Sequence, residues 1–188
     1  MPLGPSPGRD EPDVYSRLLA DRIVLVGRAL DDEVVNTVVA QLLLLESQDP
    51  SKDIGLYVNS GGGPMSAALP IYDAMQSIAP DVSTLCTGHA AGGASILLAG
   101  GARGKRSALP HARILLQQPS HPGLEGTATA IRIQVDQFLR DREVVLDIYA
   151  RHTGRPKEQV ERELERDYYM TPEQARDWGL IDNIVERK

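Results

Sequence analysis

The sequence has little cysteine and no surplus of basic residues, and each shortage excludes a class of protein. Its one cysteine, Cys86, cannot form an intramolecular disulfide, and no pair of Cys or His residues has the spacing of a structural zinc site. The formal net charge is −6, which is the wrong sign for a surface that neutralises nucleic-acid phosphates. The composition therefore predicts no metal and no nucleic-acid partner, and it favours a reducing cytoplasm.

Long apolar runs are also missing. A helix that spans a bilayer needs roughly 18 apolar residues, whereas the longest candidate, Val38 to Leu45, is short and contains Gln41. The first residues, MPLGPSPGRDEPD, carry prolines and acids where a signal peptide has a basic start and an apolar stretch. We expect a soluble protein with no membrane contact, a flexible arm over residues 1–13, and a single domain over residues 14–188.

Apolar strand-like runs alternate with segments of helical periodicity along the rest of the chain. Strands are expected at 23–27, 54–59, 82–88, 112–118 and 181–185. Helices are expected at 14–22, from Asp31 to about 46, at 65–78, at a segment ending near 99, at 127–153, from Pro156 onward, and at 172–178 with Thr171 as the N-cap. Because parallel strands need crossover connections, this order predicts an α/β fold with a mostly parallel sheet.

Two helical segments carry more apolar residues than one packing face requires. The long segment 127–153 has an apolar set wider than a narrow stripe, and the four leucines Leu42 to Leu45 point round most of a helix. Burial within one domain and contact with another subunit both explain such a pattern. The two segments together favour an oligomer, and we expect charges placed at Ile133 and Leu146 to weaken it.

Two glycine-rich elements each follow an expected strand: NSGGG at 59–63 and GHAAGGAS at 88–95. Glycines there let backbone N–H groups approach a ligand, and a helix N-terminus adds partial positive charge, so both elements could stabilise an oxyanion in acyl chemistry. Simple turn formation is the alternative explanation. Neither element has a phosphate-loop or dinucleotide-binding pattern, so no cofactor is expected.

Several segments together resemble one protein family. DVYSRLLADRIVLVG, DIGLYVNSGGG, IYDAM, PDVSTLCTGHAAGGASILLAGGARGKRSALPHARILLQQP, HTGRP and ERDYYMTPEQARDWGLIDNIV are similar to the ClpP family (peptidase S14), the proteolytic subunits of the ATP-dependent Clp protease. The resemblance implies a ClpP/crotonase-like β-α spiral head and a handle helix at about 119–153. It also implies two stacked heptameric rings, peptide hydrolysis by a Ser-His-Asp triad, and an AAA+ Clp unfoldase as partner.

The triad carries over only in part. The family's nucleophilic serine follows G-x-A-A, where this chain has Gly92, and its histidine precedes Gln-Pro, where this chain has Gln117. The triad aspartate matches Asp167. Glycine has no side chain to attack with, and an amide cannot accept and return a proton near neutral pH. The resemblance therefore points to an inactive, ClpR-like form.

The family's oxyanion donors map to Gly93 and to Gly62 or Gly63. The family usually has proline after Asn-Ser in the first glycine element, whereas this chain has Gly61 there and places Pro64 after the glycines. This departure puts the geometry of that loop in question.

Other residues could in principle replace the missing groups. Ser95 lies about one helical turn beyond Gly92 and is better explained by core packing. His89 and His111 are nearer to surface or hydrogen-bonded histidines, and His121 belongs to the loop after Pro119. His152 is interpreted as a cation at the end of the long helix, and Asp167 as the close of a charge-rich helix.

Three hypotheses follow. The first is a catalytically inactive subunit of the Clp protease complex that joins an active paralogue in a ring. The second is a slow or altered-nucleophile serine endopeptidase. The third is a crotonase-like acyl-CoA enzyme, because that fold shares the glycine-donor oxyanion site and needs no serine.

Overall fold

The computed structural model describes residues 13–119, 123 and 125–186. Its helices are α1 (Val14–Ala20), α2 (Asp32–Gln48), α3 (Met65–Ser77), α4 (Gly93–Ala99), α5 (Ala128–Thr153), α6 (Lys157–Leu164) and α7 (Pro172–Trp178). Its strands are β1 (Ile23–Val26), β2 (Ile54–Ser60), β3 (Val82–Ala91), β4 (Arg106–Ala108), β5 (Arg113–Leu116), β6 (Tyr168–Met170) and β7 (Asn183–Ile184). Strands and helices alternate through the first half of the chain, as the hydrophobic pattern predicts.

The strands form one mostly parallel sheet in the order β1-β2-β3-β4-β7. The long strand β3 has two neighbours on the same side: Thr84 to Cys86 pair with β4, and His89 to Ala91 pair with β5. β5 in turn pairs with β6, which runs antiparallel to it. The α/β class with a mostly parallel sheet is confirmed, and the branching at β3 creates the edge where the glycine-rich turn after Ala91 lies.

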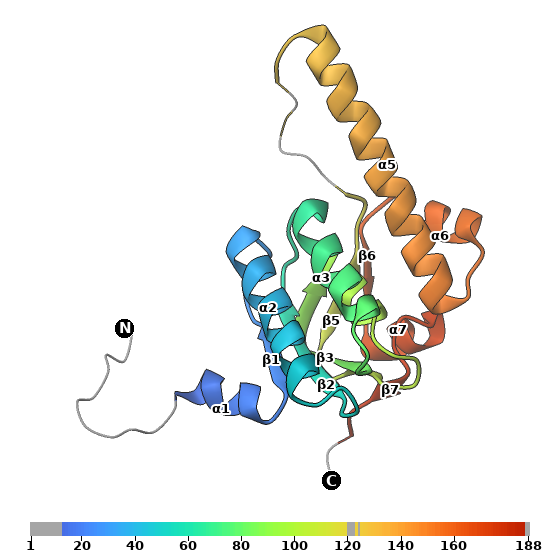
Figure 1. Cartoon of the computed structure of the whole chain (residues 1–188). Coiled ribbons are helices and arrows are strands. Elements are labelled where there is room, and N and C mark those ends of the chain that lie inside the picture. The colour runs from blue at the N-terminus through green and yellow to red at the C-terminus, as the bar shows by residue number, and fades with distance from the viewer. Residues whose placement is uncertain (1–12, 120–122, 124, 187–188) are drawn as a thin grey trace, which may run out of the picture.

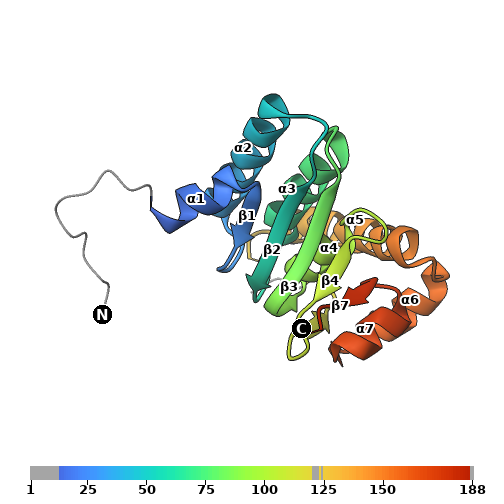
Figure 2. The same cartoon turned by 90° about the horizontal axis from the view of Figure 1, so that it is seen from below.

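Helices α2, α3, α4 and α5 pack in sequence, each against the next, and Figure 2 shows α3 and α4 together on one face of the strands. Between helices and sheet lies an apolar core that includes Val26, Leu56, Ile71, Leu97 and Tyr149, each buried. Burial of this many large apolar side chains is the main stabilising term of the fold. None of the described helices has an apolar stretch that could cross a bilayer.

Helix α2 resolves the question of the consecutive leucines. Asp31 caps it by accepting a hydrogen bond from Val34 N at 2.9 Å. Its buried residues, Val34, Val38, Leu42 and Leu45, follow helical spacing. The two leucines between them, Leu43 and Leu44, are 50% and 45% exposed, so half of the leucine run packs inside this chain and half does not.

Helix α5 is also divided. Thr127 caps its start and Gly154, at φ 74°, ends it in the left-handed conformation. Its buried residues, Val145, Leu146, Ile148 and Tyr149, all lie in the C-terminal half, whereas Figure 1 shows the N-terminal half extending beyond the sheet. Leu146 is 1% exposed, so the expectation that a charge there reports on assembly is wrong: it would disrupt the core of the single chain.

Other sequence-based expectations need correction at element boundaries. β4 and β6 were not expected, because each is only three residues long and has no alternating pattern. Pro156 is the N-cap of α6 rather than a residue of its first turn, and α6 ends at Leu164, so Asp167 lies after that helix and not within it. By contrast, α7 has the expected capping box between Thr171 and Gln174. The flexible arm lies outside the described residues except for Asp13, which caps α1.

Candidate active site

The turn between β3 and α4 has an unusual backbone shape. Gly92 adopts φ 49° and ψ −118°, directly between the last residue of β3 and the first of α4. Its N–H donates to the carbonyl of Leu115 at 3.1 Å, and its own carbonyl accepts from Ser95 N at 3.0 Å. A sharp strand-to-helix turn at positive φ is the arrangement in which hydrolases expose a nucleophile above a sheet. Here the residue at the apex of the turn has no side chain.

Gln117 lies opposite this apex. A Cβ atom added at Gly92 would lie 3.4 Å from Gln117 Oε1, which is ordinary van der Waals contact. The Nε2 atom of Gln117 points the other way, at 3.4 Å from both Oδ1 and Oδ2 of Asp167. The positions of Gly92, Gln117 and Asp167 therefore form a row, although they come from three separate parts of the chain.

Strand pairing explains how this row arises. β6 runs antiparallel to β5, with Leu116 opposite Tyr168. Gln117 follows Leu116 and Asp167 precedes Tyr168, so the two side chains emerge together at the end of the ladder. The same strand β5 pairs with the end of β3, where Leu115 is opposite Ala91. The short β6, missed in the sequence, is thus the element that places Asp167 beside Gln117.

The chemistry available to this row is limited by its side chains. The amide of Gln117 donates to the carboxylate of Asp167 and presents its carbonyl oxygen towards Gly92. An amide gains or loses no proton near neutral pH, and position 92 carries no hydroxyl or thiol. The row can hold a hydrogen bond, but positions 92 and 117 supply neither a nucleophile nor a proton acceptor, and its one ionisable side chain is that of Asp167.

The backbone donors expected from the glycine elements lie beside the turn. A Cβ atom on Gly62, which has φ 86°, would overlap Ala91 O and lie 3.3 Å from Gly93 N. Gly62 therefore packs directly against the β3–α4 turn, and the structure brings it together with Gly93. A Cβ atom on Gly63 would overlap Leu30 O instead, so Gly63 is turned towards Leu30. A Cβ atom on Gly93 would in turn lie 3.5 Å from Gly63 O, so both Gly62 and Gly63 lie beside Gly93.

One of these donors already has a partner. The buried hydroxyl of Ser60 accepts a hydrogen bond from Gly62 N at 3.0 Å, and Gly62 O accepts one from Leu30 N at 2.9 Å. Pro64 is the N-cap of α3, and a Cβ atom on Gly61 would meet nothing within 4 Å. The departures at Gly61 and Pro64 thus leave the contact between Gly62 and the turn in place.

Ser95, the candidate replacement nucleophile, and the cysteine Cys86 are both buried. Ser95 is fully buried, with its hydroxyl bonded to Gly92 O at 2.7 Å and to Tyr149 OH at 2.8 Å. The core role expected for Ser95 fits these contacts. Cys86 is also fully buried, and burial raises the pKa of its thiol to about 11, which keeps it protonated and unreactive at neutral pH.

The histidines occupy other places. His111 is exposed, His89 is half-buried with its backbone N–H bonded to Asn59 Oδ1 at 3.1 Å, and His121 lies outside the described residues. His152 Nε2 lies 2.8 Å from Tyr72 OH. Burial, together with the positive charges of Arg106 and Arg151, lowers the pKa of His152 to about 4. The interpretation of His152 as a helix-end cation is wrong, because this imidazole is neutral at pH 7.

The fold and this turn together define a class: an α/β scaffold of the ClpP/crotonase type in which a glycine-rich loop packs against a strand-to-helix turn. A family comparison gives the family itself. The family model described as Clp protease matches residues 7–188. The chain belongs to the Clp protease family, whose proteins act in protein degradation.

Proposed function

We propose that this chain is a catalytically inactive, ClpR-like subunit of a Clp protease complex. The observation that supports it most directly is the row of Gly92, Gln117 and Asp167. The backbone shape suits a nucleophile, the carboxylate suits the third triad member, and both proton-transferring side chains are replaced. In this proposal Gly93 and Gly62 or Gly63 are the remnant oxyanion donors, and Asp167 is the remnant triad aspartate.

An altered-nucleophile peptidase is the less favoured alternative. It would need Ser95 to leave its bonds to Gly92 O and Tyr149 OH and to reach the surface from full burial. It would also need a general base, and Gln117 cannot act as one. An acyl-CoA enzyme is not proposed, because the Clp protease match extends over residues 7–188.

The assembly part of the proposal rests on exposed apolar side chains. The N-terminal half of α5, which extends beyond the sheet and which we call its free half, carries Ile133 and Leu139, whose side chains are 64% and 51% exposed. Leu43 and Leu44 on α2 form a second exposed apolar area. Large exposed apolar residues that cluster on one element are typical of protein interfaces. We propose that these surfaces join other subunits in two stacked heptameric rings that contain an active ClpP paralogue. The ring would receive substrates from an AAA+ Clp unfoldase in the cytoplasm.

The decisive experiment uses protein purified from a host that lacks its own Clp protease. The chain is incubated with a short fluorogenic peptide and with a fluorophosphonate probe, and an active ClpP serves as the positive control. We expect no cleavage and no labelling of this chain. Labelling that disappears in a Ser95→Ala variant would overturn the proposal in favour of the altered-nucleophile peptidase.

A further inference from the structure

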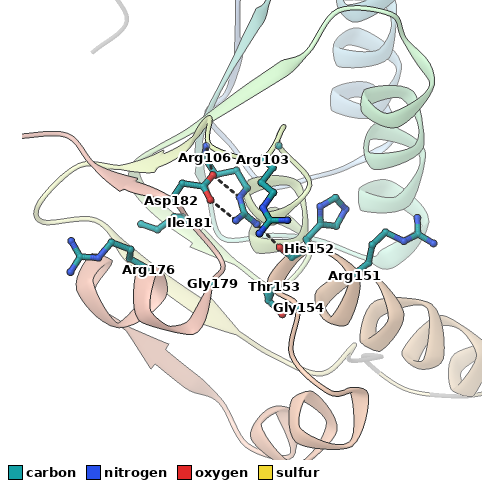
Figure 3. A pocket seen from close by; sticks show the side chains of 11 residues that line it. Arg103, Arg106, Arg151, His152, Thr153, Gly154, Arg176, Gly179, Ile181 and Asp182 are labelled. Carbon is teal, nitrogen blue, oxygen red and sulfur yellow. Dashed lines mark hydrogen bonds and ion pairs between the residues drawn. The ribbon is translucent and has the colours of Figure 1, made fainter.

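A pocket of about 460 Å³ lies where the C-terminal end of α5 meets α7 and the loop before β4 (Figure 3). It is separate from the row at Gly92. Its lining includes Arg103, Arg106, Arg151, His152, Arg176 and Asp182. A volume of this size is within the usual range for small-molecule sites.

The charge of the lining is strongly one-sided. It contains four guanidinium groups, from Arg103, Arg106, Arg151 and Arg176, against the single carboxylate of Asp182. His152, which also lines the pocket, is neutral because its pKa is about 4. A surplus of three positive charges thus collects in one concave region of a chain whose formal net charge is −6. Concave surfaces of one charge sign focus the field and attract ions of the opposite sign.

The one carboxylate in the lining is already paired with Arg106. Asp182 Oδ2 accepts from Gly104 N at 2.8 Å, from Arg106 N at 3.0 Å and from Arg106 Nε at 2.9 Å, while Oδ1 accepts from Arg106 Nη2 at 2.7 Å. Arg106 Nη1 also donates to His152 O at 2.9 Å. This bond covers a carbonyl at the negative end of the α5 dipole. Arg106 and Asp182 therefore form the floor of the pocket.

The other three arginines lack a strong partner within the part of the chain that the structure describes. Arg103 is exposed and has no carboxylate within ion-pair distance among those residues. Arg176 lies 3.7 Å from Asp177 and also interacts with Glu173, and both are exposed carboxylates of a kind whose pairs contribute little. Arg151 interacts with the hydroxyl of Tyr72. Figure 3 shows Arg151 and Arg176 on opposite sides, with Arg103 near the middle.

We propose that this pocket binds an anion with two or more linked phosphate groups. A guanidinium group presents paired N–H donors whose spacing matches phosphate oxygens. Three such groups at separate points around one pocket suit a ligand with several charged groups better than a single phosphate. Arg103 would bind the ligand at the centre, and Arg151 and Arg176 would bind it from the two sides. The proposal does not depend on whether the row at Gly92 is catalytic.

Calorimetry with sodium tripolyphosphate at low and at moderate salt tests the proposal. We expect the unmodified protein to bind, with an affinity that falls as salt rises, and removal of each arginine in Arg103→Gln and Arg151→Gln to weaken binding about tenfold. Arg132→Gln, an exposed arginine near the other end of α5, is the matched control and should bind as the unmodified protein does.

Two further ligands identify the source of the phosphates. ATP that binds tighter than tripolyphosphate would assign the site to nucleotides, whereas equal or weaker binding would assign it to inorganic polyphosphate. Three results would overturn the proposal: no binding of tripolyphosphate at low salt, an equal loss in Arg132→Gln, or citrate binding as tightly as tripolyphosphate. Because Arg103 and Arg151 are exposed, both substitutions leave the core intact, which a thermal melt verifies.

Discussion

The turn between β3 and α4 and the free half of α5 differ in what they lack. At the turn the backbone has the shape of a reactive site, but the triad serine and histidine side chains are absent. Along the free half of α5 the apolar side chains are present, but several of them are left exposed rather than packed. Gly92 is held at φ 49° with no group to present. Ile133 and Leu139 present apolar groups that remain 64% and 51% exposed.

This difference shows that the two regions respond to different constraints. The turn is fixed by strand pairing and by close backbone contacts inside one chain, so its shape does not depend on a side chain at position 92. The free half of α5 has no such internal constraint, and its exposed apolar side chains fit the proposed contacts with other subunits. Substitutions that restore side chains at the turn should therefore change activity, whereas substitutions that place charges on the free half of α5 should change assembly.

The largest expected effect comes from restoring the missing side chains. The double variant Gly92→Ser with Gln117→His should raise the peptidase activity at least about 10³-fold over that of the unmodified chain. The reason is that position 92 faces position 117, and Asp167 already contacts the side chain at position 117. The gain should be partial. Gly62 N is bonded to Ser60, and loss of one oxyanion donor costs about 10² to 10³ in rate.

Both single variants serve as controls for this restoration. Each should stay at the background rate for the fluorogenic peptide, because a nucleophile and its base act as a unit. Serine at positive φ should also lower stability by about 1–2 kcal/mol. Activity in Gly92→Ser alone would contradict the assignment of position 117 as the base position.

The second effect separates the two halves of α5. Leu146→Asp should destabilise the single chain by more than about 4 kcal/mol, because it places a charge in the packed half. Ile133→Asp and Leu139→Asp should leave the melting temperature of the chain nearly unchanged and dissociate the oligomer. Sedimentation velocity and thermal melts measure both properties, and an oligomer that tolerates both exposed substitutions would remove the free half of α5 from the interface.

The third effect tests how tightly the turn is packed. A Cβ atom on Gly93 would lie 2.7 Å from the Cβ atom of Ala68, so Gly93→Ala should cost about 1–3 kcal/mol by overpacking. Gly61→Ala, where the added atom meets nothing within 4 Å, is the matched control and should be neutral or slightly stabilising. Urea unfolding should show this difference, and equal midpoints would mean that the turn is loosely packed.

The smallest effect concerns pH and the packed end of α5. His152 has a pKa of about 4 in the folded chain and an ordinary value of 6.5, so below pH 6.5 the unfolded chain takes up a proton that the folded chain does not. Stability is therefore full above pH 6.5 and falls as the pH drops towards 4. The imidazole is only half-buried, so the loss between pH 7 and 5 should be about 1 kcal/mol.

His152→Gln removes this titration and keeps a side chain that can bond to Tyr72 OH. Urea unfolding at pH 7 and pH 5 should therefore show a smaller loss of stability in the variant than in the unmodified chain. Equal losses in both proteins would show that other groups cause the acid sensitivity.

The sequence predicted those elements whose signals are local. Helix α7 was located because Thr171, Pro172, Gln174 and Gly179 each have a positional preference, and α2 because Asp31 caps a periodic apolar segment. The α/β class followed from the alternation of these patterns. β4 and β6 could not be found in this way, because strands of three residues are determined by partners far along the chain.

For the candidate site, too, the sequence identified individual residues but not their arrangement in space. Gly92, Gln117 and Asp167 were identified by resemblance, and no local pattern indicated that they lie in a row, because that arrangement depends on the pairing of β5 with β6. The neutral state of His152 was missed because it depends on Tyr72, Arg106 and Arg151, which come from different elements. The arginine pocket was missed for the same reason.

The ion pair between Arg106 and Asp182 also affects how the chain is completed during synthesis. The two residues are 76 positions apart, and the guanidinium of Arg106 is 5% exposed. A chain that stops before Asp182 would bury this charge without its counter-ion, at a cost of about 3–5 kcal/mol. Stable closure of the sheet around β4 therefore waits until Asp182 has been made, and chains truncated before residue 182 should be preferred substrates for degradation.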